Sequence, residues 1–384
     1  MNFLNIFKQE IKTIFTDIAI VLTIIGGVIL YSFLYPQPYS AQSISKLCIS
    51  VVDLDRSDIS RDIIFKLNST PQISVTRVDS SEYDAKEAMI SNEVKAIIVI
   101  PPHFKKDLAL HKSPTISLGA DSSYFLVYGG VLEGAMKSVL TESAVLKVAE
   151  LLKEGIPISG AEESYTPYSL NSMNLFNTQN SYTQYVIPAV FVLILQQTML
   201  IGLGILGGGV NERREVQGKT WMVMLSRVLI FGGIFFTHML FYFGFSFEFF
   251  GVTHIASIYD LLSFGVPFIL STAFLGIFLG SLFNSREIAT PVILFSSLPL
   301  VFSAGFIWPV EEIPKALHVV SNFVPSTPAI NGFLKLNQMG AEFSLILPQY
   351  TLLWIQAIIY MFLGYYFINK KRKNYVNNPK CNDS

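Results

Sequence analysis

The chain has 384 residues, of which 27 are Lys or Arg and 28 are Asp or Glu, so charged side chains make up 14% of it, against about 25% in an ordinary soluble domain. Hydrophobic residues make up 51% and the mean hydropathy is +0.47, which excludes a soluble monomer and indicates an integral membrane protein. The net charge of −1 shows no nucleic-acid-binding character, and two distant cysteines, Cys48 and Cys381, exclude a disulfide framework and a cysteine-based zinc site.

Residues 1–17 have the pattern of an amphipathic helix, which suits a helix lying at the membrane interface. The following apolar run, residues 18–35, is long enough to be the first transmembrane helix. A cleaved signal peptide is the alternative, but the run is long and no clear small-x-small cleavage site follows it. The apolar positions of the amphipathic helix recur at three- or four-residue steps: Phe3, Phe7, Ile11 and Ile14.

Residues 36–183 predict an extracytoplasmic α/β domain, because short strand-like runs alternate with helical patterns. Residues 37–183 alone hold 30 of the 55 charged side chains, which is the composition of a soluble domain. Residues 161–182 are rich in Ser, Asn, Thr and Tyr and predict a return linker. Strands are expected at 47–54, 73–78, 96–100 and 115–119, and helices at 57–67, 81–91 and 124–154.

Residues 184–369 predict a five-helix transmembrane domain, in which each apolar run is near the ~20 residues that cross a bilayer. The expected fold is therefore an α-helical integral membrane protein with six transmembrane helices and an α/β domain inserted between helices 1 and 2. The five later spans are expected at residues 185–208, 228–250, 258–283, 288–307 and 350–368.

The short loops predict the orientation. Lys8 and Lys12 precede the first span, further basic residues lie between spans 2 and 3, and residues 370–384 form a basic tail, whereas residues 251–257 contain no Lys or Arg. The positive-inside rule then places both termini in the cytoplasm and the α/β domain outside.

Residues 211–225 form a predicted cytoplasmic coupling loop. Its Gly218-Lys219-Thr220 resembles the end of a phosphate-binding loop, but Arg213 stands where the motif needs its first glycine, so ATP binding is excluded here. We expect instead a short amphipathic helix that docks a cytoplasmic partner, although the charges could simply be positive-inside flanking residues. The docking residues are Glu212, Arg213, Arg214 and Glu215, which offer charge pairs, with Thr220 and Trp221.

Residues 308–349 predict a re-entrant outer segment, because prolines break an otherwise continuous apolar stretch into helices too short to span. Acidic Glu311 and Glu312 before Pro314 resemble a helix N-terminus. Such a segment can close a pathway; an ordinary extracellular loop is the alternative. The candidate gate residues are Phe306, Trp308, Pro309, Glu311, Pro314 and Pro325.

Polar residues within spans are costly and often face a bundle interior or a cavity. Gln196 and Gln197 lie in the middle of the second span and His238 in the middle of the third, so each can line a translocation path. The alternative is interhelical hydrogen bonding. No metal site is expected, since no ligand cluster surrounds His238 in the sequence.

Three motifs together resemble the ABC-2 type export permeases. Residues 213–221 resemble that family's RERE-x-GT loop, with Lys219 as an insertion; the run 303–309 with Pro314 and Pro325 is similar to its segment between spans 5 and 6. Asp53-Leu54-Asp55 and Ser57 resemble the start of the external domain in the long-loop subgroup.

The resemblance implies an inner-membrane permease subunit of an ATP-binding cassette exporter, not itself an enzyme. Two permease subunits, identical or different, would form the pathway, each bound to a separate ATPase subunit that holds ATP and Mg. The chain itself would bind no cofactor. The resemblance further implies lipid contact, export of drugs or other amphipathic small molecules, and a periplasmic membrane-fusion adaptor with an outer-membrane channel as partners.

Three alternatives differ in class. A membrane sensor or receptor would need a cytoplasmic signalling module, for which the short inner segments leave no room. A mechanotransmitting permease relative has three spans after its external domain, where five are expected here. A membrane enzyme would need a nucleophile with a base, paired intramembrane carboxylates or metal-ligand spacing, which the sequence does not show.

Overall fold

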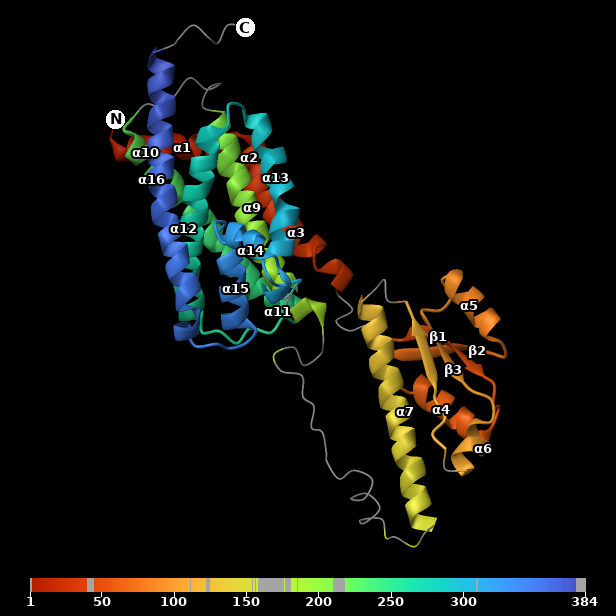
Figure 1. Ribbon diagram of the computed structural model, residues 1–384. Coiled ribbons are helices and arrows are strands. Elements are labelled where there is room, and N and C mark those ends of the chain that lie inside the picture. The colour runs from red at the N-terminus through yellow and green to blue at the C-terminus, as the bar shows by residue number, and fades with distance from the viewer. Residues whose placement is uncertain are drawn as a thin grey trace. The chain divides into compact units, whose positions relative to one another are not determined.

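The computed structural model describes residues 2–39, 45–110, 112–121, 125–153, 181–184, 186–209, 218–308 and 310–377, with residues 155, 157 and 176. Two compact units divide the chain: an α/β unit, Ser43–Met173, and a helical unit composed of Met1–Gln42 and Asn174–Ser384 (Figure 1).

The α/β unit contains a four-stranded sheet in the order β2-β1-β3-β4. The central strand β1 (Leu47–Asp53) runs parallel to β2 (Ile73–Asp79) and to β3 (Ala96–Ile100), and β4 (Ser117–Ala120) is antiparallel to β3. Strand β1 is buried over its last five residues, as expected for a strand covered on both faces.

Four helices accompany the sheet: α4 (Asp58–Asn68), α5 (Glu82–Ile90), α6 (Phe104–Ala109) and α7 (Phe125–Lys153). Helix α5 packs against β1 and β3, while α4 and α7 pack on each other and against β2. The core lies between these layers and includes Ile49, Val51, Ile63, Leu67 and Val131.

The turn from β1 into α4 is built by the motif at residues 53–57. Asp53 Oδ1 accepts hydrogen bonds from the backbone N–H groups of Asp55 (3.1 Å) and Arg56 (2.8 Å), and its Oδ2 accepts one from Ser60 Oγ. The Ser57 hydroxyl accepts from Ser60 N at 3.1 Å and so caps α4. These side chains therefore satisfy the backbone of the turn.

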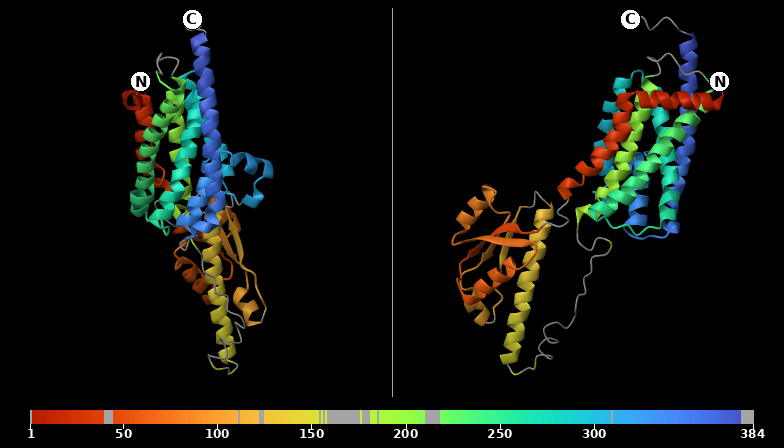
Figure 2. Two further views of the ribbon diagram at one scale, coloured as in Figure 1. Left: turned by 90° about the vertical axis from the view of Figure 1, so that its left-hand side faces the viewer. Right: turned by 180° about the vertical axis from the view of Figure 1, so that it is seen from behind.

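The helical unit begins with α1 (Phe3–Thr16), which meets the helix Ile18–Leu34 at a bend of 79°. That second helix consists of α2 (Ile18–Val21), a π-helical turn η1 (Leu22–Gly27) and α3 (Val28–Leu34). Figure 2 shows α1 lying across one end of the bundle. The bend follows Asp17, whose extended backbone and side-chain cap begin a new helix.

Five helices are long and apolar enough to cross a membrane, and the bent N-terminal pair makes a sixth if it counts as one span. They are α9 (Val186–Gly208), α10 (Thr220–Leu240) with its continuation through η4 (Phe241–Ser246) and α11 (Phe247–Phe250), α12 (Ile258–Leu282), α13 (Arg286–Ser303), and α16 (Leu347–Asn377). The chain is thus mostly helical and built for a membrane.

Helix α9 is the centre of this unit. It packs against α12, α13 and α15, and almost all of its residues are buried. A Cβ atom on Gly207 would lie only 2.6 Å from the backbone of Gly280 on α12. These small residues therefore let two helices of one chain approach closely.

Short elements lie between α13 and α16: η5 (Val310–Glu312), α14 (Lys315–Ser321), α15 (Ser326–Asn337) and η6 (Phe343–Ile346). We call α14, α15 and the turn between them the hairpin. In Figure 1 it lies within the length of the bundle, beside α9, α12 and α16. Helix α15 packs against those three helices.

Two boundaries differ from the sequence prediction. Helix α10 begins at Thr220 rather than 228, so residues 220–225 are its first turns and not part of a separate loop. Helix α16 continues to Asn377, so residues 370–377 of the expected tail are helical. In both places charged residues led the sequence prediction to make the helix too short. Two of these charged residues, Arg227 and Lys371, have partners within the unit.

Candidate functional site

One end of the helical unit, which we call the α1 end, gathers segments that are far apart in the sequence. It comprises α1, the end of α9, the beginnings of α10 and α13, and the last turns of α16 (Figures 1 and 2). The predicted coupling loop connects two of these segments, since it follows α9 and precedes α10.

Helix α1 contacts the residue at which the described chain resumes after that loop. Gly218 has φ of +132°, and a Cβ atom there would lie 2.5 Å from Cδ1 of Ile6. This backbone conformation favours glycine, and a Cβ atom there would force the end of the Ile6 side chain to move. The end of the coupling loop is therefore held directly against the N-terminal helix.

A buried ion pair joins the same two segments. Arg227 of α10 donates from Nε to Glu10 Oε2 at 3.0 Å and from Nη2 to Glu10 Oε1 at 3.2 Å, and both side chains are less than 10% exposed. The two-point geometry fixes the orientation of the guanidinium as well as its distance. Glu10 lies on the buried face of α1 with Ile6 and Ile14.

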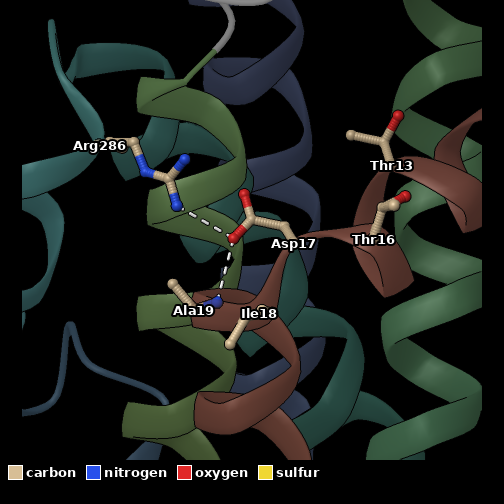
Figure 3. Close-up of a pocket in the computed structure, with 6 residues that line it drawn as sticks. All are labelled: Thr13, Thr16, Asp17, Ile18, Ala19 and Arg286. Carbon is tan, nitrogen blue, oxygen red and sulfur yellow. Dashed lines mark hydrogen bonds and ion pairs between the residues drawn. The ribbon is translucent and has the colours of Figure 1, made fainter.

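A second ion pair spans the bend of the N-terminal helix. Arg286 Nη2 of α13 donates to Asp17 Oδ1 at 3.0 Å, and the same oxygen accepts from the backbone N–H of Ala19 at 3.1 Å. Figure 3 shows these side chains with Thr13 and Thr16 around an open pocket of about 480 Å³. Asp17 thus starts the spanning helix and ties it to α13.

The last turns of α16 complete the α1 end. Thr220 is buried and its hydroxyl donates to Asn369 Oδ1. Lys371 Nζ donates to the carbonyl of Phe283, at the end of α12, at 2.6 Å and lies 3.4 Å from that of Gly207 on α9. A cation beside helix C-terminal carbonyls is favourable, because these groups carry partial negative charge.

The predicted docking residues fall into two groups. Glu212, Arg213, Arg214 and Glu215 lie outside the described residues. Thr220 is buried in the contact with α16, whereas Trp221 is 46% exposed on the first turn of α10. Trp221 therefore presents an apolar surface next to the loop.

The predicted gate residues do not form one cluster. Phe306 and Pro325 are buried, Trp308 is 57% exposed, and Glu311 and Pro314 are exposed. Pro309 lies outside the described residues. Pro325 is at the turn of the hairpin, and its burial places that turn inside the unit.

The three polar residues of the spans lie in different surroundings. Gln196 is fully buried and its Oε1 accepts from Ser326 N, at the start of α15, at 2.5 Å. Gln197 is buried, and its amide atoms have no hydrogen-bond partner among the described residues. His238 is half-buried, edge-on to Phe235 with ring centroids 5.4 Å apart, and lies against the backbone of Ile24. The structure does not bring the three together.

Comparison with known proteins decides the family. The model of the family described as "ABC-2 family transporter protein" matches residues 18–366. The chain belongs to the ABC-2 transporter family. The ABC-2 chain is 21% identical over 374 residues to the inner membrane transport permease YhhJ of Escherichia coli (strain K12), covering 92% of each protein. The permease of the same name from Shigella flexneri matches equally.

The family resemblance inferred from the three motifs is therefore confirmed, and this ABC-2 permease is a multi-pass membrane protein of the transport type. Within its described residues, no group of three or more His, Cys, Asp or Glu side chains could hold a metal ion.

Sequence reasoning missed both ion pairs of the α1 end of this ABC-2 permease. One signal was present: Glu10 is four residues from both Ile6 and Ile14, so it shares a face with two apolar residues. An acidic residue in that position predicts a buried basic partner, although the sequence does not say which one.

Proposed function

We propose that this permease is the membrane subunit of an ATP-driven exporter. Two permease subunits form the translocation pathway, and a separate ATPase subunit binds each of them. ABC-2 permeases generally work with such a subunit, and this chain lacks a complete phosphate-binding loop of its own. ATP and Mg belong to that partner.

The observation that carries the proposal is the connection of the coupling loop to α1. The end of the loop and the first turns of α10 are fixed to the N-terminal helix twice, through Gly218 with Ile6 and through Arg227 with Glu10. A buried two-point ion pair resists displacement, because separating it leaves charges without partners. A force applied at residues 212–215 and Trp221 is therefore transmitted to α1 and, through Asp17 and Arg286, to α13.

The proposal also includes an orientation, which the positive-inside rule supports, and partners and a cargo class, which the family resemblance supports. The α1 end faces the cytoplasm, so both termini are inside, and the α/β unit is periplasmic, where it meets an adaptor linked to an outer-membrane channel. The hairpin closes the outer side of a pathway that Gln196, Gln197 and His238 help to line. The cargo class is drugs or other amphipathic small molecules.

The test is the variant Arg213→Ala/Arg214→Ala/Glu215→Ala, co-expressed with a candidate ABC ATPase subunit that co-purifies with the unaltered permease. We expect normal membrane insertion but loss of both ATPase co-purification and transport-coupled ATP hydrolysis. The matched control replaces one exposed acidic and two exposed basic residues of the α/β unit, Asp84, Lys86 and Lys106, and should keep both. Unchanged coupled hydrolysis in the loop variant would contradict the docking role.

A further inference from the structure

The turn of the hairpin is bonded to side chains of two long helices, and its last residue, Pro325, is buried. Gln196, near the middle of α9, accepts from Ser326 N. On α16, Gln356 Nε2 donates to the carbonyl of Asn322 at 2.7 Å, and the Tyr360 hydroxyl donates to that of Phe323. The end of α14 and the start of α15 thus have their backbone groups paired by distant side chains.

The side chains around this turn keep further polar atoms without partners. Gln196 Nε2, Gln356 Oε1, Ser326 Oγ and Thr327 Oγ1 are all buried and have no hydrogen-bond partner among the described residues. The four residues are at most 4% exposed. Buried polar atoms in native proteins nearly always have a partner, and an ordered water supplies it where the protein does not.

Thr272 of α12 lies at the level of this group by helix register. Gly276 contacts Leu200 and Leu203 of α9, and Gly280 contacts Leu203 and Gly207, so the two helices run in the same direction. One turn earlier on both helices, Thr272 is level with Gln196. Its hydroxyl is also buried without a partner among the described residues.

We propose that these side chains form a binding site for small uncharged hydrogen-bonding groups. The hairpin-tip cluster consists of Gln196, Thr272, Ser326, Thr327 and Gln356. Water occupies it in the resting protein, and a hydroxyl or amide group of the cargo replaces that water during passage. The occupancy by water stands independently, whereas the passage of cargo rests on the proposed function.

The chemistry of the cluster selects uncharged groups. Its members are amides and hydroxyls, which offer donors and acceptors but no net charge. Two titratable side chains contact the turn: Tyr360, whose hydroxyl donates to the carbonyl of Phe323, and His318, whose ring meets the Asn322 amide at 3.1 Å. An ion brought to this place would lose its hydration without gaining a counter-charge.

The test compares two threonines that are both buried in long helices. Thr272→Val removes a hydroxyl of the cluster, while Thr198→Val, the control, removes one that bonds to the carbonyl of Ile194 in its own helix at 2.6 Å. If water is bound, Thr272→Val lowers the melting temperature of the purified full-length protein by about 2 °C, and Thr327→Val does the same. The control should change it by less than about 1 °C.

If the cluster holds no water, the same substitutions should leave the melting temperature unchanged or raise it, because replacing a buried hydroxyl without a partner by a methyl group is favourable. A melting temperature of Thr272→Val and Thr327→Val equal to or above that of the wild type therefore overturns the proposal.

Radiolytic hydroxyl-radical labelling gives a second measurement. Met199, one turn from Gln196, should be oxidised several-fold faster than Met239, which is buried against Gly265; equal protection of both overturns it. Neither measurement depends on the ATPase, so a failure of the proposed function would leave both results unchanged.

Discussion

Arg227 and Glu10 are 217 residues apart in the sequence, yet they form a two-point ion pair that is almost completely buried. The pair fixes the N-terminal helix to the first turns of α10. Because the coupling loop ends just before those turns, the pair reinforces the attachment that Gly218 and Thr220 already give to that end of the loop.

Removing one partner of this pair should destabilise the helical unit much more than removing both partners. Glu10→Ala leaves the Arg227 charge buried alone and should destabilise the helical unit by about 3–5 kcal/mol, whereas replacing both residues by apolar ones of similar volume should cost far less. We would measure the melting temperature of Glu10→Ala, Arg227→Met and Glu10→Leu/Arg227→Met in one detergent.

The exposed Lys8→Ala on the same helix is the control and should melt like the wild type, since its side chain is in solvent. Additive losses in the double variant would argue against a direct interaction between Glu10 and Arg227.

The contact between Gly207 and Gly280 predicts opposite effects for two identical substitutions. Gly207→Ala places a methyl group 2.6 Å from the backbone of Gly280, so α9 and α12 must separate, at a cost of about 1–3 kcal/mol. Gly233→Ala meets nothing within 4 Å and should be neutral or slightly stabilising, because alanine is the better helix former. Thermal unfolding of both variants measures the difference; a Gly207→Ala variant as stable as Gly233→Ala would exclude the close packing.

In the α/β unit, Asp79 should give the sheet an acid-sensitive stability. Burial tends to raise the pKa of Asp79, but hydrogen bonds from Ser50 Oγ (2.6 Å) and Arg77 outweigh it, and the pKa lies below its ordinary value. A carboxyl with a lowered folded-state pKa contributes stability above its unfolded pKa, near 3.9, and loses it as the pH falls through the folded value.

Hydrogen exchange of β1 and β2, corrected for the intrinsic effect of pH, should therefore show protection that falls below about pH 4. Asp79→Asn should lower protection at neutral pH and flatten its dependence on acid. The exposed Asp84→Asn on α5 serves as the control and should keep the wild-type profile. If Asp79→Asn keeps the wild-type dependence of protection on acid, the Asp79 carboxylate does not contribute to the stability of the sheet.

The sequence predicted elements whose pattern is local. The apolar runs located α9, α12 and α16 because length and hydropathy suffice for a spanning helix. The beginning of α10 was missed, since Arg227 looks like a flanking charge until its partner is known. The two acids before Pro314 suggested a helix N-terminus, and α14 begins at the next residue, Lys315.

The partners of these elements could not be predicted. The amide of Gln196 bonds to a residue 130 positions away and that of Gln356 to one 34 positions away, and no periodicity encodes such a pairing. The polar residues of the spans were recognised as unusual. The sequence does not distinguish a polar residue that forms interhelical hydrogen bonds from one that lines a translocation path. Only the hairpin turn, placed against the middle of α9, shows that Gln196 holds another segment of the chain.

The orientation predicted from basic residues can be tested at two exposed turns at opposite ends of the helical unit. Asn284 follows α12 and Thr253 precedes it. In a chain with Cys48 and Cys381 replaced by serine, we expect Thr253→Cys to react with a membrane-impermeant maleimide added to intact spheroplasts. Asn284→Cys should react only after the membrane is permeabilised, because the positive-inside rule predicts a cytoplasmic location for the end that carries the basic residues near α1 and α13. The exchanged pattern would reverse the orientation of the whole unit and would place the coupling loop outside, where no ATPase could reach it. Reaction of both residues from the same side would instead show that α12 does not cross the membrane.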